Sequence, residues 1–212
     1  MNKGLRIIFV STGRCGTTRI TEILQKYLPA GCTIVHQTGL SQLANVIGNI
    51  QYHFPIGESL GDFIYNKMIL EGDNFISVDP LSSMIVPRSV IKSENTFIIH
   101  LMRNSEEFSA SMFRLTRKKN KSFIAHNFIP FWQPYLFPLE NILSKKIFDK
   151  YSRIHKEKND FFEQRFSSNP HYVKITMEKI FQKNILSSLM SDILDTKIAI
   201  PEFELLKKTN QT

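Results

Sequence analysis

Cysteine is scarce in this chain, whose 212 residues include only Cys15 and Cys32. Two cysteines cannot form a disulfide framework, which excludes the small secreted folds that depend on one and indicates a reducing compartment. Long apolar runs are absent as well, so no segment is predicted to cross a bilayer. The chain also begins without the pattern of a secretory signal peptide. We therefore expect a protein of the cytoplasm.

Acidic residues are outnumbered, because 19 Asp and Glu stand against 27 Lys and Arg, giving a formal net charge of +8. A basic chain attracts anions, and nucleic acid is one candidate. The basic residues do not gather into the footprint that nucleic acid needs. Their densest run is Arg117-Lys118-Lys119-Asn120-Lys121, which we interpret as a solvated loop. A small polyanion accounts for part of the excess charge, and we expect no nucleic-acid partner.

Core-forming residues are plentiful, with 42% hydrophobic residues and 17 phenylalanines. At this length we expect a single domain, residues 1–212. Short apolar runs alternate with amphipathic stretches, which predicts an α/β fold with a mostly parallel sheet flanked by helices. The predicted strands are Leu5–Val10, Cys32–His36, Asn74–Asp79, Asn95–Met102 and Tyr172–Met177. The predicted helices are Thr17–Leu28, Leu60–Glu71, Ser105–Arg117 and Ser144–Phe166, with a further helical pattern over 43–50.

A glycine loop joins the first predicted strand to the first helix. Gly13 and Gly16 permit a tight turn in which the backbone comes close to a ligand, and Thr17 and Thr18 open the helix. Free backbone N–H groups and the positive end of the helix dipole then point at the same place. The sequence therefore predicts an anion site, for a phosphate or an analogous group, in the segment Gly13-Arg14-Cys15-Gly16-Thr17-Thr18.

Two familiar kinds of phosphate loop are excluded by spacing. The loop of nucleotide hydrolases has four residues between its glycines and then a lysine. Here only Arg14 and Cys15 lie between the glycines, and no lysine precedes Thr17. A cysteine phosphatase places an arginine six positions after its nucleophile, and that position holds Thr21. What remains is a basic residue, a small residue and then Gly-Thr-Thr.

A second anion motif follows the predicted strand Asn95–Met102. Arg103 comes at once, and Asn104 is predicted to cap the next helix with Glu107 in the capping-box position. Ser111 lies two turns into that helix, on the face that looks back at Arg103. A planar guanidinium fork and a hydroxyl are the donors that a phosphate prefers. The sequence thus predicts a second phosphate site.

Both motifs, in this order and separation, resemble those of sulfotransferases. The segment Arg14–Thr18 resembles their 5′-phosphosulfate loop, and Arg103 with Ser111 resembles the pair that holds the 3′-phosphate. The resemblance covers most of the chain and implies a P-loop-like sulfotransferase fold. It also implies transfer of a sulfuryl group from 3′-phosphoadenosine-5′-phosphosulfate (PAPS) to a hydroxyl or amine, with PAP as product. The residues that it assigns to cofactor binding are Gly13, Arg14, Cys15, Gly16, Thr17, Thr18, Arg103 and Ser111.

The resemblance leaves the acceptor open among carbohydrate, lipid, peptide and small molecule. Animal Golgi sulfotransferases carry a membrane anchor, and its absence here favours a soluble bacterial enzyme. Metal ligands are not expected, because Cys15 and Cys32 lack ligand spacing with each other or with His36. Two alternatives remain: a catalytically inactive nucleotide-binding protein of the same fold, and an atypical P-loop kinase.

The chain departs from the family pattern at two places. Arg14 stands where cytosolic sulfotransferases usually have a catalytic lysine, and a guanidinium stabilises developing charge without acting as an acid at neutral pH. A late glycine-rich clamp for the 3′-phosphate is missing, because no glycine follows Gly72. Lys207 and Lys208 are candidates to replace it, although a basic tail is the simpler interpretation.

Two residues compete as the base that removes the acceptor's proton. His36 and Asp79 both stand at carboxyl ends of predicted strands, where ligands bind in open α/β sheets. Their structural alternatives are a hydrogen-bonded strand-end histidine and a turn former before Pro80. We favour His36, because the pKa of histidine suits a base at neutral pH.

Aromatic residues and prolines crowd the stretch 122–139, where the prolines argue against one long helix. Such a stretch could line an acceptor pocket or form a lid. Alternatively, it is a loop that packs its aromatic rings onto the core.

Overall fold

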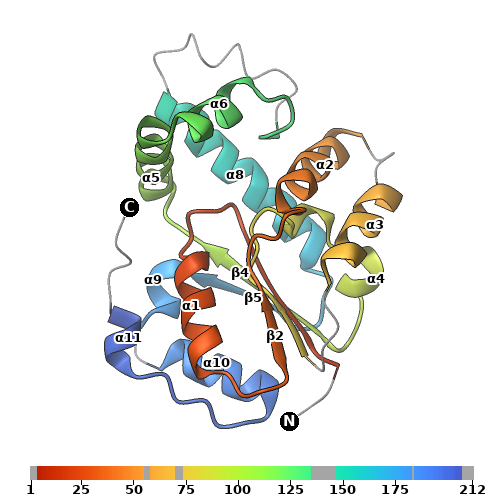
Figure 1. The fold of residues 1–212 in the computed structure, drawn as a ribbon, viewed down its shortest axis with the longest axis vertical. Helices are drawn as coiled ribbons and strands as arrows, with labels where there is room; N and C mark the ends of the chain where they lie inside the picture. Colours follow the sequence, from red (N-terminus) through yellow and green to blue (C-terminus); the bar gives the residue numbers. More distant parts are fainter. Residues whose placement is uncertain (1–3, 55–57, 70–73, 135–146, 183, 207–212) are drawn as a thin grey trace.

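The computed structural model describes residues 4–54, 58–69, 74–134, 147–182 and 184–206. At its centre lies a five-stranded sheet in the order β2-β3-β1-β4-β5, in which every neighbouring pair is parallel (Figure 1). The predicted mostly parallel α/β fold is confirmed. Because all strands run the same way, their carboxyl ends share one edge of the sheet. The strands are β1 (Arg6–Ser11), β2 (Cys32–Val35), β3 (Asn74–Ser77), β4 (Thr96–Met102) and β5 (Tyr172–Thr176).

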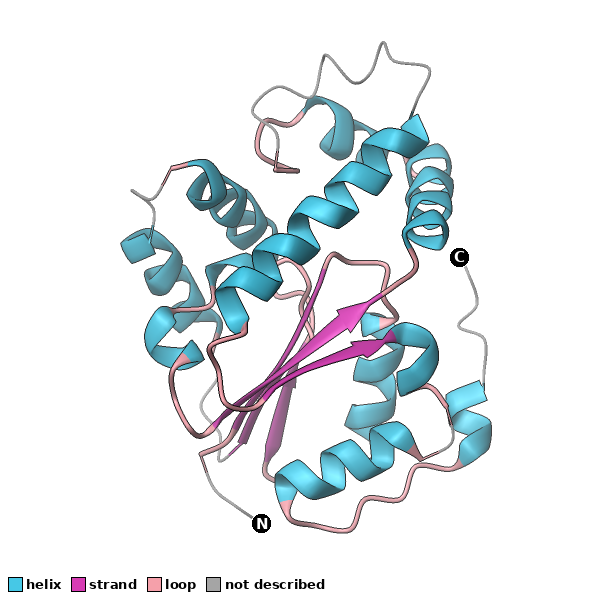
Figure 2. Ribbon diagram, turned by 180° about the vertical axis from the view of Figure 1, so that it is seen from behind, coloured by secondary structure: helices cyan, strands magenta, loops and turns pink. Residues whose placement is uncertain are grey.

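Helices cover both faces of this sheet (Figure 2). Among the described residues, no helix combines the length and the apolar character that a membrane span requires. The helices are α1 (Thr17–Tyr27), α2 (Ser41–His53), α3 (Glu58–Met68), α4 (Arg88–Ile91), α5 (Ser105–Lys118), α6 (Asn120–Phe128), α8 (Ile147–Phe166), α9 (Met177–Ile180), α10 (Ile185–Leu194) and α11 (Glu202–Leu206), with a 3-10 turn η2 (Ser83–Ile85).

The central strand β1 packs against the helices on both faces of the sheet. Ile7 and Phe9 pack into a core shared with α1 and α10, whereas Ile8 and Val10 pack into a core shared with α2, α3, α4 and α8. Successive side chains of a strand point to opposite faces, so an unbroken apolar run is what a doubly covered strand needs. All four of these side chains are buried.

A third, smaller core joins α5 to the first half of α8. It consists of Phe108 and Met112 from α5 and Tyr151 and Ile154 from α8. This packing holds α5 beyond the tip of β4, over the carboxyl edge of the sheet (Figure 1). The second predicted phosphate motif thereby comes to the same edge as the glycine loop.

Residues 117–121 are exposed, as expected for a solvated segment, but their interpretation as a loop is wrong. Arg117 and Lys118 end α5, and α6 begins at Asn120. Only Lys119 separates the two helices, with an extended backbone (φ −124°, ψ 104°) that ends one helix and starts the next. The expected proline break is confirmed, since α6 stops at Phe128, ahead of Pro130.

Candidate functional site

The glycine loop after β1 has the backbone of an anion cradle. Gly13, Arg14 and Gly16 all lie in the left-handed region, with φ values of 85°, 56° and 76°. A Cβ atom on Gly16 would stand 2.8 Å from the Phe181 ring, so glycine is required there for space as well as for conformation. Gly16 also caps α1 without a side-chain hydrogen bond, and the first turn holds no acidic residue. The N–H groups that open α1 are therefore not capped by a side chain.

Cys15 contributes to this loop through its buried side chain. Its side chain is fully buried, and its Sγ donates a hydrogen bond to the carbonyl oxygen of Gly13 at 3.2 Å. Burial raises the pKa of the Cys15 thiol to about 11, so the thiol stays protonated at neutral pH. The side chain thus stabilises the turn and is no nucleophile.

The second motif forms a capped helix start whose arginine supports the loop. Asn104 Oδ1 accepts hydrogen bonds from the N–H groups of Glu106 and Glu107 at 2.9 and 3.3 Å, which confirms the predicted cap. The Glu107 carboxylate pairs with Arg103 Nε at 3.2 Å. Arg103 Nη1 donates to the carbonyl oxygen of Arg14 at 2.8 Å. Arg103 therefore links the end of β4 to the glycine loop.

The two motifs meet directly. Arg14 Nε donates a hydrogen bond to Ser111 Oγ at 2.9 Å, which brings the guanidinium of the loop onto α5. Desolvation, followed by the charges of Arg103 and Arg114, lowers the pKa of Arg14. Two guanidinium groups and one hydroxyl therefore meet at the carboxyl edge, and the charge of Arg114 also acts on Arg14, so an anion would be strongly attracted there.

Arg114 was not among the residues predicted from the sequence. It lies three positions after Ser111 on α5, and residues three apart are neighbours on a helix surface. The signal was therefore present in the spacing. It was not specific, because exposed arginines on helices are common.

His36 follows β2 and faces the loop from the other side. Its Nδ1 lies 2.8 Å from the carbonyl oxygen of Val78, and a carbonyl can only accept, so Nδ1 carries a proton. In the neutral ring Nε2 then holds the lone pair and accepts a hydrogen bond from the Thr18 hydroxyl at 3.4 Å. The hydrogen bond to the Val78 carbonyl oxygen therefore fixes both the orientation of the ring and the tautomer that a base requires.

An open hollow of about 420 Å³ lies beside this histidine. It is bounded by α1 on one side and by β2 with the turn after it on the other. Thr18 and His36 belong to its wall, so a molecule in the hollow would be next to the glycine loop. Its lining residues are Thr18, Thr21, Glu22, Gln25, Ile34, Val35, His36 and Thr38.

Asp79 is buried and has both carboxylate oxygens occupied. Oδ2 accepts from Ser41 Oγ at 2.5 Å, and Oδ1 accepts from the Leu81 N–H at 3.0 Å. Its backbone oxygen accepts from the hydroxyls of Ser82 and Ser83. The carboxylate thus connects the end of β3 to the start of α2 and shapes the turn at Pro80.

Within the aromatic stretch, residues 122–128 belong to α6, and the segment that follows them packs onto α2. Asn45 Nδ2 donates to the carbonyl oxygen of Trp132 at 2.9 Å, and Asn49 Nδ2 donates to that of Phe131 at 2.8 Å. His53 Nε2 is 3.0 Å from the carbonyl oxygen of Pro134. These contacts favour a loop held against the fold over 129–134. Residues 135–139 of this stretch, like Lys207 and Lys208, lie outside the described residues.

Within the part of the chain that the structure describes, no three His, Cys, Asp or Glu side chains gather as a metal site would need.

Comparison with known proteins shows the fold. No protein-family model matches the chain, and no curated protein matches it in sequence. Mouse sulfotransferase SULT7A1, solved in complex with PAP, matches 92% of this chain with a TM-score of 0.52 at 15% identity. This chain covers only 60% of the mouse protein's length. A sulfotransferase from Alicyclobacillus acidocaldarius matches 98% of this chain, and 87% of its own, with a TM-score of 0.51 at 9% identity. The predicted sulfotransferase fold is thus confirmed.

Proposed function

We propose that this chain is a PAPS-dependent sulfotransferase, which moves a sulfuryl group to a hydroxyl or amine of an acceptor. The observation that carries this proposal is the hydrogen bond from Arg14 to Ser111. It joins the glycine loop and the Arg103 motif into one site on a sulfotransferase fold. The two motifs would otherwise be separate features of an α/β protein.

The residues of the site fit a ligand with anionic groups at two ends. The N–H groups of the loop 13–18 and the start of α1 suit the 5′-phosphosulfate. Arg103, Arg114 and the Ser111 hydroxyl suit the 3′-phosphate, since guanidinium forks and hydroxyls are strong phosphate donors. Arg14 belongs to both groups, because its backbone forms the loop and its guanidinium contacts Ser111.

The chemistry assigns a distinct duty to each side chain. Bound PAPS would supply the sulfuryl group on a phosphate leaving group. His36 Nε2, with its lone pair directed to the loop, would accept the proton of the acceptor hydroxyl or amine. Arg14 and the start of α1 would stabilise the negative charge that grows on the leaving oxygen. Thr18, 3.4 Å from His36, would orient the acceptor against the loop.

We propose His36 as the base. Asp79 instead positions the turn after β3 against the start of α2. The Asp79 carboxylate is buried, and its oxygens already accept from Ser41 and Leu81. A base needs an accessible lone pair within reach of the substrate. His36 meets that condition, because it borders the hollow that adjoins the loop and its Nε2 accepts only a long hydrogen bond, 3.4 Å, from the Thr18 hydroxyl. The hollow is our candidate for the acceptor site, whatever the class of acceptor.

Nucleotide binding tests this proposal most simply. We expect PAP to raise the melting temperature by much more than AMP, ATP or GTP does, because of these ligands only PAP carries both a 5′-phosphate and a 3′-phosphate. A ligand present at about 100 times its Kd stabilises the native state by about 2.7 kcal/mol. Equal shifts of the melting temperature with PAP and AMP would contradict the proposed 3′-phosphate site. A larger shift with ATP than with PAP would support the kinase alternative.

Arg114→Ala is expected to raise the Kd for PAP about tenfold, because it removes one charged donor from a solvent-accessible phosphate site. The Kd for AMP should not change. Calorimetric titration measures both constants.

Arg117→Ala is the matched control for that variant. Arg117 has the same charge on the same helix, but its guanidinium lies 4.6 Å from the centre of the Phe113 ring. An equal loss of PAP affinity in both variants would mean that general charge, and not Arg114 itself, attracts the nucleotide.

A further inference from the structure

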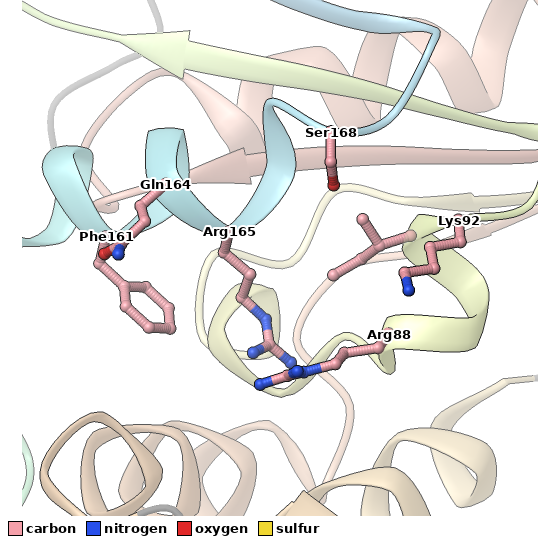
Figure 3. A pocket seen from close by; sticks show the side chains of 7 residues that line it. Arg88, Lys92, Phe161, Gln164, Arg165 and Ser168 are labelled. Atoms are coloured by element: carbon pink, nitrogen blue, oxygen red, sulfur yellow. The ribbon is translucent and has the colours of Figure 1, made fainter.

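A second hollow lies on another part of the molecule, between α4 and the end of α8 (Figure 3). Its volume is about 360 Å³. Both helices lead into the amino ends of strands, α4 into β4 and α8 into β5. The glycine loop and Arg103 lie at the carboxyl edge, so the length of β4, about 20 Å, separates the two places. The lining residues are Arg88, Ile91, Lys92, Phe161, Gln164, Arg165 and Ser168.

Cationic side chains dominate the lining. Three of the seven lining residues, Arg88, Lys92 and Arg165, are cationic, and none of the seven is acidic. Figure 3 shows the guanidinium groups of Arg88 and Arg165 extending toward one another, with Lys92 and Ser168 directed at the same space. A lining of this kind attracts an anion.

Arg165 is held in a fixed position within this arrangement. Its Nη2 donates to the carbonyl oxygen of Val86 at 2.8 Å, and its guanidinium lies 5.9 Å from the centre of the Phe161 ring. An arginine fixed in this way loses little conformational entropy when it binds a ligand. By contrast, Arg88 and Lys92 are exposed.

The remaining wall selects for more than charge. Ile91 and Phe161 give the hollow an apolar side, and the Ser168 hydroxyl and the Gln164 amide add hydrogen-bonding groups. A volume of this order suits a small organic molecule, since ligand pockets start near 300 Å³. An inorganic anion alone would leave the apolar side unused.

We propose that this hollow binds a small aromatic phosphate or sulfate monoester, with its anionic group on Arg88, Lys92 and Arg165 and its ring against Phe161. Guanidinium forks match the tetrahedral oxyanions of both esters. This site is independent of the proposed function, because it shares no residue with the glycine loop, Arg103 or Ser111.

Calorimetric titration with phenyl phosphate, and in parallel with phenyl sulfate, tests the proposal. The double variant Arg88→Ala/Lys92→Glu should lose binding by at least about tenfold, because it removes two of three cationic contacts. Both residues are exposed, so the variant should fold, and its melting temperature is measured beside that of the wild type. Lys92→Glu alone is the milder variant and should weaken binding in the same direction.

Arg103→Ala locates the binding event. It should bind phenyl phosphate as the wild type does, whether or not PAP binds at the other site. If Arg103→Ala abolishes binding while the double variant preserves it, the ester occupies the glycine loop and the proposal is overturned. Equal affinity for inorganic phosphate and phenyl phosphate would refute the role of the apolar wall.

Discussion

Replacing His36 by alanine should lower turnover by about 10²- to 10⁴-fold, which is the usual contribution of a general base. The Val78 carbonyl oxygen holds Nδ1 at 2.8 Å, so the lone pair of Nε2 faces the loop where the acceptor would react. The Kd for PAP should stay within about twofold of the wild type, because the base acts on the acceptor and not on the nucleotide. Single-turnover rates together with calorimetric Kd values separate the two effects.

Asp79→Asn is the matched control for that experiment, since it keeps the side-chain shape and removes the carboxylate. We expect a loss of stability, because Ser41 and Leu81 both donate to this carboxylate in a buried place. Turnover of the folded variant should remain close to the wild type. If Asp79→Asn abolishes turnover below its melting temperature and His36→Ala does not, Asp79 is the base.

Removing the Arg103 side chain should weaken PAP binding by about 2 to 3 kcal/mol, or roughly a hundredfold, because a charged donor to a phosphate is lost. Adenosine 5′-phosphosulfate lacks the 3′-phosphate and should lose much less. Some loss is expected for this ligand too, since Arg103 also donates to the Arg14 carbonyl oxygen and supports the loop. Competition binding with both nucleotides measures the difference.

Ser111→Ala provides the comparison for Arg103→Ala. It removes the hydroxyl that accepts from Arg14 and leaves every guanidinium in place. Its effect on PAP should have the same direction and a smaller size, about 1 kcal/mol. An equal loss for PAP and adenosine 5′-phosphosulfate in both variants would mean that these residues maintain the loop without contacting the 3′-phosphate.

Local patterns were enough to predict the five strands and the start of α5. The apolar run of β1 indicated a strand covered on both faces, and the observed strand spans Arg6–Ser11. Asn104 was predicted to begin a helix, and its side chain accepts from two N–H groups of α5. Strand ends shifted by one or two residues: β2 stops at Val35 and β3 at Ser77. The turns that follow these strands carry His36 and Asp79. Their polar side chains are compatible with the last residue of a strand and with the first residues of a turn, so they do not mark the boundary.

Elements stabilised by distant contacts could not be predicted from the same patterns. The helix α6 has no distinct apolar face, and the Asn127 Oδ1 in it accepts a hydrogen bond from Lys150 Nζ of α8 at 2.9 Å. A missed helix with a readable signal is α10, because its buried residues Leu186, Met190 and Leu194 recur at helical spacing. The order of the strands depends on pairing between segments such as β1 and β3, which no single stretch of sequence encodes.

The candidate site also has parts that the local sequence predicts and parts that depend on the fold. The glycine loop and the Arg103 segment each have a local signature, and each could be found separately. Their contact through Arg14 and Ser111 joins positions 97 residues apart, so only the fold brings it about. Arg14 was expected in the 5′-phosphosulfate loop and at the transferring group, and the structure adds its hydrogen bond to the second motif.

The central claim is that this chain transfers a sulfuryl group, and radiolabelled sulfur in PAPS measures that directly. The chain would be incubated with labelled PAPS and panels of carbohydrates, lipids, peptides and small phenols, beside the His36→Ala variant. We predict that the label moves to at least one class of acceptor, with PAP as the other product, and that the variant transfers it far more slowly. Tight binding of PAP with no transfer to any panel would contradict the claim and identify a nucleotide-binding protein without this activity.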